Sequence, residues 1–326
     1  MSRVLAGPEA IAAGIAAMRA GRPVAFPTET VYGLGASALD EDAVRAVFAL
    51  KGRPSSNPLI VHVSEIEMAR TLVSEWTEQA DLIARAFWPG PVTIVLNKSK
   101  TVPDAVSAGG QTVAVRCPRH PVALALIEAF GGPMVGPSAN PSGWISPTTP
   151  EHVLAGFPGE DLIIIDGGAC HAGIESTVLD LSAAEPRILR PGVIGAQALS
   201  VTLGEQVALD PVTDPAAPAR SPGLLGAHYQ PRTPCRLVET GQLASTPQQT
   251  AVLSWSRDDH PRGGALIGLP ADAEGYAAGL YDAMHRADAG RADEIWIEHP
   301  PVNHADEHGA IWVAVLERLA RATKSG

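Results

Sequence analysis

Short apolar runs alternate with amphipathic helical patterns along the first two thirds of the chain. Between Asp40 and Lys51, apolar residues recur three and four positions apart and so line one face of a helix, with Asp40 as its N-cap and Gly52 as the residue that ends it. The same patterns predict further helices over residues 10–20, 66–73, 79–87, 121–130 and 193–200. Strands are predicted over residues 23–26, 59–63, 88–96, 112–116, 133–136, 162–166, 176–181 and 187–189. This alternation predicts an α/β fold, a twisted mixed sheet with flanking helices.

The pattern changes near residue 204. Residues 204–234 are rich in Pro and Ala and show no apolar period, which is typical of a linker. Beyond them, strands are predicted over residues 236–239, 251–255, 265–269 and 294–298, and helices over residues 274–287 and 306–323. These elements predict a small Rossmann-like three-layer α/β domain, although it contains no G-x-G-x-x-G fingerprint. We therefore expect a domain over residues 1–203, a linker over 204–234 and a second domain over 235–326.

Composition and charge narrow the class of protein. The chain has 326 residues, 45% of them hydrophobic, and a formal net charge of −11, which opposes non-specific binding to nucleic acid. Its three cysteines are far apart and form no C-x-x-C pair, so neither a zinc site nor a disulfide framework is expected. No apolar run reaches the ~18 residues that a membrane span requires, and the Ala-rich first helix lacks the features of a signal peptide. We expect a cytoplasmic protein.

Cationic side chains stand at the ends of the predicted elements. Lys51 and Arg53 flank the end of a helix, and Arg116 and Arg190 each end a strand. Each position has an ordinary explanation, such as complementing a helix dipole. Four such cations beside Gly-rich and Pro-rich turns, in an acidic chain, indicate instead a pocket for an anionic ligand such as a nucleoside triphosphate. Strand alternation puts Arg116 on the face opposite its apolar neighbours, exposed or in a cleft.

Neutral hydrogen-bonding residues gather in the turns next to these cations. They are Thr28, Thr30, Ser138, Asn140, Ser142, Thr148, Ser176 and Thr177. Each could simply stabilise its turn. Gly33, Gly35, Gly136 and Gly143 would let a ligand approach the backbone closely.

Three further residues stay open on the sequence alone. His62, on an alternating strand, is more often structural than catalytic. Glu29 and Glu175 are either carboxylates for a metal-bound phosphate or solvated loop charges. Walker A, G-x-S-x-G and H-E-x-x-H motifs are absent, so covalent acyl transfer and zinc hydrolysis lack their usual parts.

A series of motifs identifies a family resemblance. In order, the chain contains PTETVYGLG, KGRPSSNPLIVHV, FWPGPVTIVL, VAVRCP, GPSANPSG, GIESTVLDL and ILRPG. With these it resembles the YrdC/Sua5 family, whose K-x-R and S-x-N signature is here Lys51-Gly-Arg53 and Ser138-Ala-Asn140. The segment SPGLLGAHYQP at Ser221–Pro231 and the domain after it are similar to the long, two-domain Sua5 form. The resemblance implies a YrdC-like first domain and a Sua5 C-terminal domain.

The resemblance implies a nucleotidyltransferase, a threonylcarbamoyl-AMP synthase that condenses L-threonine, bicarbonate and ATP and releases pyrophosphate and water. Its product would serve N6-threonylcarbamoyladenosine (t6A) modification of tRNA through a downstream threonylcarbamoyl transferase complex. The implied threonine site comprises Thr30, His62, Arg116, Ser138 and Ser176. The implied ATP site comprises Arg53, Asn57, Thr112, Asn140, Thr148, Arg190 and Tyr229. Lys51 and Arg53 would stabilise phosphate charge in catalysis, and Mg²⁺ would enter with the ATP phosphates.

Two alternatives are weighed against this expectation. A related carbamoyl-adenylate enzyme of hydrogenase maturation would carry acylphosphatase-like and zinc-finger segments, and this chain has neither. An RNA-binding module would need a basic face with aromatic residues, but only 5% of the residues are aromatic and the net charge is negative. Direct contact with tRNA stays open.

Overall fold

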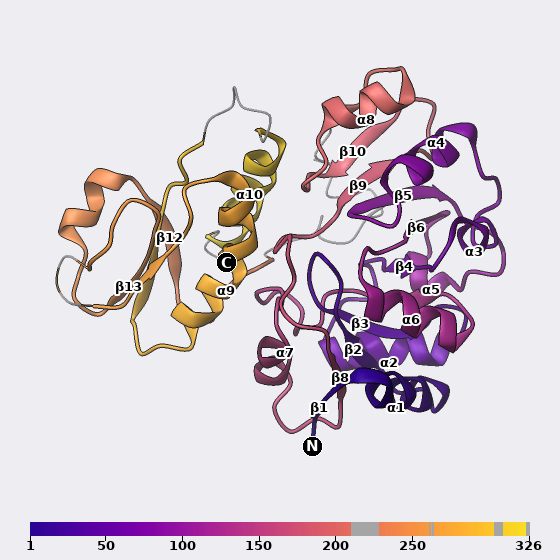
Figure 1. Ribbon diagram of the computed structural model, residues 1–326, viewed down its shortest axis with the longest axis horizontal. Coiled ribbons are helices and arrows are strands. Elements are labelled where there is room, and N and C mark those ends of the chain that lie inside the picture. The colour runs from indigo at the N-terminus through magenta and orange to yellow at the C-terminus, as the bar shows by residue number, and fades with distance from the viewer. Residues whose placement is uncertain (210–227, 261, 263, 303–308, 324–326) are drawn as a thin grey trace.

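Two separate β-sheets organise the chain (Figure 1). The computed structural model describes residues 1–209, 228–260, 262, 264–302 and 309–323. The larger sheet, here the N-terminal sheet, has the strand order β1-β8-β2-β3-β7-β4-β6-β5-β9-β10-β11. Its strands are β1 (Arg3–Ala6), β2 (Val24–Phe26), β3 (Gly33–Ser37), β4 (Ile60–His62), β5 (Val92–Asn97), β6 (Thr112–Arg116), β7 (Met134–Val135), β8 (Ile163–Asp166), β9 (Thr177–Asp180), β10 (Arg187–Arg190) and β11 (Ala208–Leu209). Parallel and antiparallel pairs both occur, as predicted for a mixed sheet.

Helices flank the N-terminal sheet. They are α1 (Gly7–Arg19), α2 (Glu41–Lys51), α3 (Ile66–Arg70), α4 (Glu78–Phe87), α5 (Asp104–Ser107), α6 (Pro121–Phe130), α7 (Pro150–Gly156) and α8 (Ala196–Leu203). All but α5 and α7 lie where the sequence pattern predicted them. The predicted ends of α2 are confirmed: Asp40 accepts hydrogen bonds from the backbone amides of Asp42 and Ala43, and Gly52 is left-handed with φ 60°. This geometry places Lys51 at the last turn of the helix.

The two faces of the N-terminal sheet differ in character. On β6, Val113 and Val115 enter the main hydrophobic core, while Ala114 and Arg116 point to the other face. His62 of β4 pairs in register with Arg116, so both side chains lie on that second face. The candidate site is built on this face.

Strand β3 was read from the sequence as part of a turn, and this was wrong. The residues GLGAS are poor strand formers, yet they pair with β2 and β7. The two glycines are used for close packing, because a Cβ on Gly33 would lie 2.8 Å from the Phe26 ring and one on Gly35 would lie 2.6 Å from Met134. Side chains of the protein therefore fill the space that a Cβ would take, although Gly33 also lines the cavity of the candidate site. The elements β1, α5 and α7 were also missed, being short.

The second sheet, here the C-terminal sheet, is wholly parallel, with the order β12-β15-β13-β14. It comprises β12 (Cys235–Val238), β13 (Thr250–Ser254), β14 (Leu266–Gly268) and β15 (Glu294–Glu298), with helices α9 (Ala273–Asp288) and α10 (Gly309–Ala322) and the 3-10 helix η1 (Thr240–Ser245). Both α-helices pack on one face, while Leu243 of η1 covers the other. Within the predicted linker, residues 208–209 add an edge strand beside β10, and residues 210–227 lie outside the described residues.

Helices α9 and α10 face the N-terminal sheet (Figure 1), and the contact is apolar. One hydrophobic cluster joins Val31, Ile145 and Ile174 of the N-terminal sheet's loops to the residues of these helices. The backbones meet closely at Gly173, where a Cβ would lie 2.3 Å from the Ala277 carbonyl oxygen. A Cβ on Gly195 would likewise lie 2.5 Å from Ala310 Cβ.

The contact at Gly173 makes a stability prediction. Gly173 has φ +69° and touches backbone atoms of α9, whereas Gly168 has φ +83° and open space around it. For Gly168→Ala, the free energy of unfolding should therefore fall only by the cost of a left-handed alanine backbone, about 1 kcal/mol. Gly173→Ala adds overpacking against a backbone that cannot move aside, for a total of about 2–4 kcal/mol. Urea unfolding of the two variants measures both values, and equal losses would contradict the close contact.

Candidate active site

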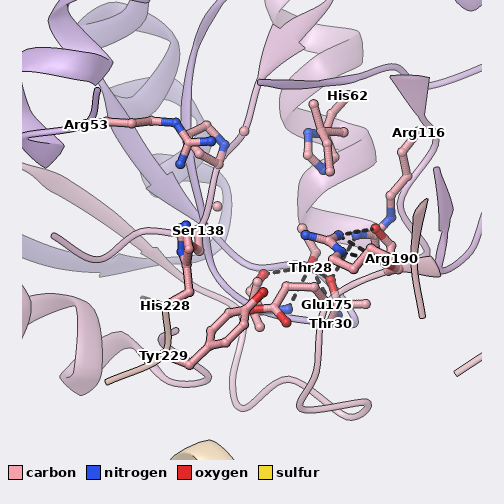
Figure 2. Close-up of a pocket in the computed structure, with 16 residues that line it drawn as sticks. Thr28, Thr30, Arg53, His62, Arg116, Ser138, Glu175, Arg190, His228 and Tyr229 are labelled. Atoms are coloured by element: carbon pink, nitrogen blue, oxygen red, sulfur yellow. Dashed lines mark hydrogen bonds between the residues drawn. The ribbon is translucent and has the colours of Figure 1, made fainter. Parts of the chain in front are cut away.

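A small cavity lined by many polar and charged residues lies on the second face of the N-terminal sheet, between its loops and Tyr229 (Figure 2). Its volume is about 60 Å³. The lining residues are Thr28, Thr30, Val31, Gly33, Arg53, Ile60, His62, Arg116, Gly136, Pro137, Ser138, Glu175, Ser176, Arg190, His228 and Tyr229. In the view of Figure 2, Arg53 approaches from one side and Arg116 and Arg190 from the other. Three guanidinium groups thus converge, which indicates a site for an anionic ligand.

Arg116 is almost fully buried, with 3% of its surface exposed, and is held on three sides. Its Nη2 lies 2.7 Å from Glu29 Oε2, its Nη1 donates to Thr30 Oγ1 at 3.0 Å, and its Nε donates to the Gly90 carbonyl at 3.2 Å. Thr30 Oγ1 lies 2.8 Å from Thr28 Oγ1. Burial opposes ionisation of Glu29, but the Arg116 charge outweighs it and lowers the pKa of the carboxyl. The Arg116 guanidinium is therefore rigidly placed and has N–H groups left for a ligand.

His62 is held neutral beside Arg116. Burial, with a contribution from the Arg116 charge, lowers the pKa of its imidazole to about 3. The ring packs edge-on against Phe26, and its Nδ1 is buried without a hydrogen-bond partner among the described residues. A Cβ on Gly136 would lie 2.6 Å from this Nδ1, so the absent side chain makes room for the imidazole. A neutral imidazole with a free nitrogen is suited to hydrogen-bond a polar ligand.

Arg190 and Ser176 form a second polar group. Arg190 ends β10, and Ser176 stands directly before β9, the strand that pairs with β10. The Arg190 guanidinium donates to the Ser176 carbonyl and, at 3.1 Å, to Ser176 Oγ. Ser176 Oγ also lies 2.8 Å from Thr93 Oγ1. Burial lowers the pKa of Arg190 from its usual value, but a guanidinium stays charged.

Lys51 and Arg53 brace the opposite wall of the cavity. Lys51 Nζ donates to the carbonyls of Ser138 and Asn140, both at 2.5 Å, and the residue is buried. Burial, then the nearby Arg53 charge, lowers its pKa well below the usual range. Arg53 donates to the Asn57 and Pro58 carbonyls and reaches the cavity, and burial lowers its pKa to about 10. Lys51 thus ties the end of α2 to the S-x-N loop.

Glu175 and Tyr229 connect the cavity to the C-terminal unit, which is the C-terminal sheet with its helices. The Glu175 carboxylate accepts hydrogen bonds from Ser146, Tyr281 and Arg318, the last two on α9 and α10. The Tyr229 ring stacks on Tyr281, with 5.7 Å between ring centroids, and its backbone is left-handed with φ 65°. Burial, then the Glu175 charge, raises the pKa of Tyr229 to about 12, so its hydroxyl is neutral.

Most of the residues predicted for the site meet in the cavity. Thr30, Arg53, His62, Arg116, Ser138, Ser176, Arg190 and Tyr229 line it. Five others do not: Lys51, Asn57, Thr112, Asn140 and Thr148. Asn57 and Asn140 are nevertheless buried, each with a side-chain oxygen that has no partner among the described residues. Thr112 lies at the start of β6, at the other end of the strand from Arg116, and Thr148 lies beside His152 just before α7.

Other lining residues had no role assigned from the sequence. Ile60 and Val31 give only an apolar signal, and His228 stands in a segment read as linker. Thr28 had been noted as a turn residue, and Glu175 as either a carboxylate for a metal-bound phosphate or a solvated loop charge. The position of Glu175, between the motif glycine and Ser176 in GIESTV, is the one local signal that could have placed it here.

The carboxylates near the cavity do not form a metal site. Glu29 is paired with Arg116, and Glu175 with Arg318. Within the described part of the chain, no group of three or more His, Cys, Asp or Glu residues could hold a metal ion. A divalent cation would therefore need oxygen ligands from a bound phosphate chain.

In the described part of the chain, no helix is both long and apolar enough to cross a membrane.

Comparison with known proteins gives the class and then the family. A family model described as telomere recombination, named for Sua5, YciO and YrdC, matches residues 16–192, and one described as the C-terminal domain of threonylcarbamoyl-AMP synthase matches residues 194–324. The chain is thus a two-part α/β protein of the long form, and it belongs to the Sua5/YrdC family.

Relatives of this family match over nearly the whole chain. The threonylcarbamoyl-AMP synthase of Pyrococcus abyssi is 38% identical over 96% of this chain and 93% of that protein. That of Bacillus subtilis is 37% identical over 96% and 92%. The crystal structure of P. abyssi Sua5 complexed with L-threonine superposes with a TM-score of 0.88 at 36% identity, covering 99% of this chain and 97% of that one.

The neutral imidazole makes a prediction about acid stability. Below pH 6.5 an unfolded His62 binds a proton, while the folded one does so only near a pKa of about 3, so stability falls as the pH falls between these values. From pH 7 to pH 5 the loss from His62 is about 2 kcal/mol. His62→Gln should remove this part of the slope in urea unfolding. His171→Gln, at an exposed position, should leave the slope intact. Equal slopes for wild type and His62→Gln would refute the prediction.

Proposed function

We propose that this protein is a threonylcarbamoyl-AMP synthase, which converts L-threonine, bicarbonate and ATP into L-threonylcarbamoyladenylate, pyrophosphate and water. The observation that carries the proposal is the convergence of Arg53, Arg116 and Arg190 with hydroxyl groups in one cavity of a Sua5/YrdC chain. The relatives that match nearly the whole chain bear this enzyme's name. The threonine bound to P. abyssi Sua5 supports the choice of amino acid.

Threonine fits the group formed by Arg116, Thr30 and Thr28. Of the five N–H bonds of a guanidinium, Arg116 donates one to the Gly90 carbonyl and one to Thr30, and its Nη2 forms an ion pair with Glu29, so each terminal nitrogen keeps an N–H group for a ligand. Those two can bind a carboxylate as a fork. The Thr28 and Thr30 hydroxyls, and the free nitrogen of His62, offer neutral partners for the substrate's hydroxyl and amine. The pairing with Glu29 keeps the guanidinium fixed before substrate arrives.

Phosphate charge fits the remaining cations. In the reaction, a carbamate oxygen of N-carboxylated threonine attacks the α-phosphorus of ATP, so that the new O–P bond forms as the bond to pyrophosphate breaks. Arg53 and Arg190 stand at the cavity to stabilise the charge on the phosphate oxygens, so catalysis rests on positioning and electrostatics. Lys51 acts on the wall, because it holds the carbonyls of Ser138 and Asn140. The unpartnered oxygens of Asn57 and Asn140 support their assignment to the nucleotide site.

Magnesium belongs to this proposal as a companion of ATP. The phosphate oxygens would supply the ligands, since Glu29 and Glu175 are engaged by arginines. Bound in that way, Mg²⁺ would neutralise part of the phosphate charge. The partners beyond the substrates, a threonylcarbamoyl transferase complex and tRNA, and the cytoplasmic location follow from the proposed role in t6A modification.

The size of the cavity adds a condition for ligand entry. A volume of about 60 Å³ is far below the ~300–1,000 Å³ of typical ligand pockets. Tyr229 and His228 form one of its walls, so their movement would enlarge it for ATP. The left-handed backbone of Tyr229 is costly for a non-glycine residue, which favours such a movement.

The alternatives are less well supported. The match of residues 194–324 to the synthase C-terminal domain distinguishes this chain from a hydrogenase-maturation enzyme. An RNA-binding module would not need buried guanidinium groups aimed into a small cavity, and the net charge of −11 opposes it.

The activity is tested by pyrophosphate release. Purified protein with Mg²⁺-ATP should release pyrophosphate only when both L-threonine and bicarbonate are present. L-valine, which has a methyl group in place of the hydroxyl, and L-serine, which lacks the methyl group, replace threonine as controls for the hydroxyl and the methyl group respectively. Release that is indifferent to threonine would remove the proposed reaction.

The role of Arg116 is tested by Arg116→Lys, which keeps a charge for Glu29 but loses the fork. The KM for threonine should rise about tenfold or more, in line with the loss of a charged hydrogen bond. The KM for ATP should change far less. Arg85→Lys, at an exposed position on α4, is the matched control. An unchanged KM for threonine would show that Arg116 does not bind its carboxylate.

A further inference from the structure

Arg318 is a buried charge outside the cavity that the proposed mechanism does not use. It lies on α10, in the last part of the chain, and only 1% of its surface is exposed. Its Nε donates to Glu175 Oε2 at 3.1 Å, and its Nη1 donates to the Pro191 carbonyl at 2.7 Å and to Glu317 Oε2 at 2.8 Å. Its guanidinium also lies 5.7 Å from the centre of the Tyr229 ring.

The two partners of Arg318 across the interface stand next to cavity residues. Glu175 directly precedes Ser176, and Pro191 directly follows Arg190. Ser176 and Arg190 are hydrogen-bonded to each other, and both line the cavity. One guanidinium from the C-terminal unit therefore holds the two segments that carry this pair. The two segments are also packed closely at Gly192, where a Cβ would lie 2.4 Å from the Thr177 nitrogen, so they have little room to move relative to each other.

Arg318 also neutralises a carboxylate that would otherwise disturb the cavity. Glu175 lines the cavity, and a free negative charge there would repel phosphate. Glu175 also interacts electrostatically with Arg190 as well as with Arg318. Without Arg318, the Glu175 carboxylate would offset part of the positive charge of Arg190 that should stabilise the phosphates. Despite burial, the Arg318 charge keeps the pKa of Glu175 below its usual value, so the carboxylate is ionised and the pair is a true ion pair.

We propose that Arg318 is a positioning residue for the nucleotide side of the site: through Glu175 and Pro191 it sets the place and the available charge of Arg190. The inference rests on the proposed function. It assigns to the C-terminal unit a direct part in building the site. The threonine side should be less affected, because Ser176 is the one implied threonine-site residue next to a partner of Arg318, and the hydrogen bonds that Arg318 donates to Glu175, Pro191 and Glu317 reach none of Arg116, Thr30 and Thr28.

The test compares Arg318→Met, Arg318→Lys and the double variant Glu175→Gln/Arg318→Met, with Arg236→Met as a control. Arg236 is a half-exposed arginine on β12 of the same unit and lies on the Trp296 ring. Thermal unfolding and circular dichroism establish that each variant is folded. Pyrophosphate release then gives kcat and KM for ATP and for threonine separately, and calorimetric titration with ATP gives its Kd.

For Arg318→Met we expect kcat/KM for ATP to fall about tenfold or more, with a smaller change in the KM for threonine. Glu175→Gln/Arg318→Met should recover part of the loss, since no unpaired carboxylate remains. Arg318→Lys should lie between wild type and Arg318→Met, and Arg236→Met should match wild type. ATP parameters that stay at the wild-type level in a folded Arg318→Met would overturn the proposal, as would equal losses for both substrates with no recovery in the double variant.

Two complications are covered by the same set. If Arg318→Met does not fold, the double variant decides, because it still frees Pro191: weakened ATP binding supports the proposal and unchanged binding overturns it. If wild type itself shows no threonine-dependent pyrophosphate release, the proposed function fails. The ATP titrations then still report whether Arg318 sets the nucleotide site.

Discussion

The pairing of buried charge governs the whole site. Removing an ionised side chain from water is costly, and the cost is offset only when partners satisfy it in good geometry. Here Arg116 is matched by Glu29 and Arg318 by Glu175, while Lys51 is satisfied by backbone carbonyls alone. Each of these contacts joins segments far apart in the sequence. The loops around the cavity are therefore held in place by electrostatics as much as by the hydrophobic core beneath them.

This arrangement also separates two kinds of cation. Arg53, Arg116 and Arg190 line the cavity itself, whereas Lys51 and Arg318 lie behind it and hold its walls. The site can thus present strong positive charge to a ligand and stay rigid when that ligand is absent. Rigid donors that need no rearrangement are the arrangement that electrostatic catalysis requires.

Local pattern was enough to predict the strands and helices that lead into the site. The N-cap at Asp40, the left-handed Gly52 and the alternation along β6 were all readable, and they place Lys51, Arg53 and Arg116 near the cavity. Strand β3 was not readable, because its glycines resemble a turn and only the packing of Phe26 and Met134 explains them.

Pairings across the interface could not be predicted either. Arg318 and Glu175 are 143 residues apart, and nothing in the local sequence of α10 distinguishes an arginine that reaches into the interface from one on the surface. Lys51 illustrates the same limit. Its place at the end of α2 was predictable, but the fold of the S-x-N loop determines that it binds backbone carbonyls and does not line the cavity. Residue type and spacing indicate which groups are available, and only the tertiary structure decides which are already engaged.

The glycine contacts between the two units have a consequence for chimaeric proteins. At Gly173 against Ala277 and Gly195 against Ala310, small residues on both sides let the surfaces approach so closely that one methyl group does not fit. A C-terminal unit transplanted from a relative would dock only if its counterparts to these alanines were equally small. Across homologous chains, the two residues of each such contact should vary together, so a chimaera has to take both of them from the same parent.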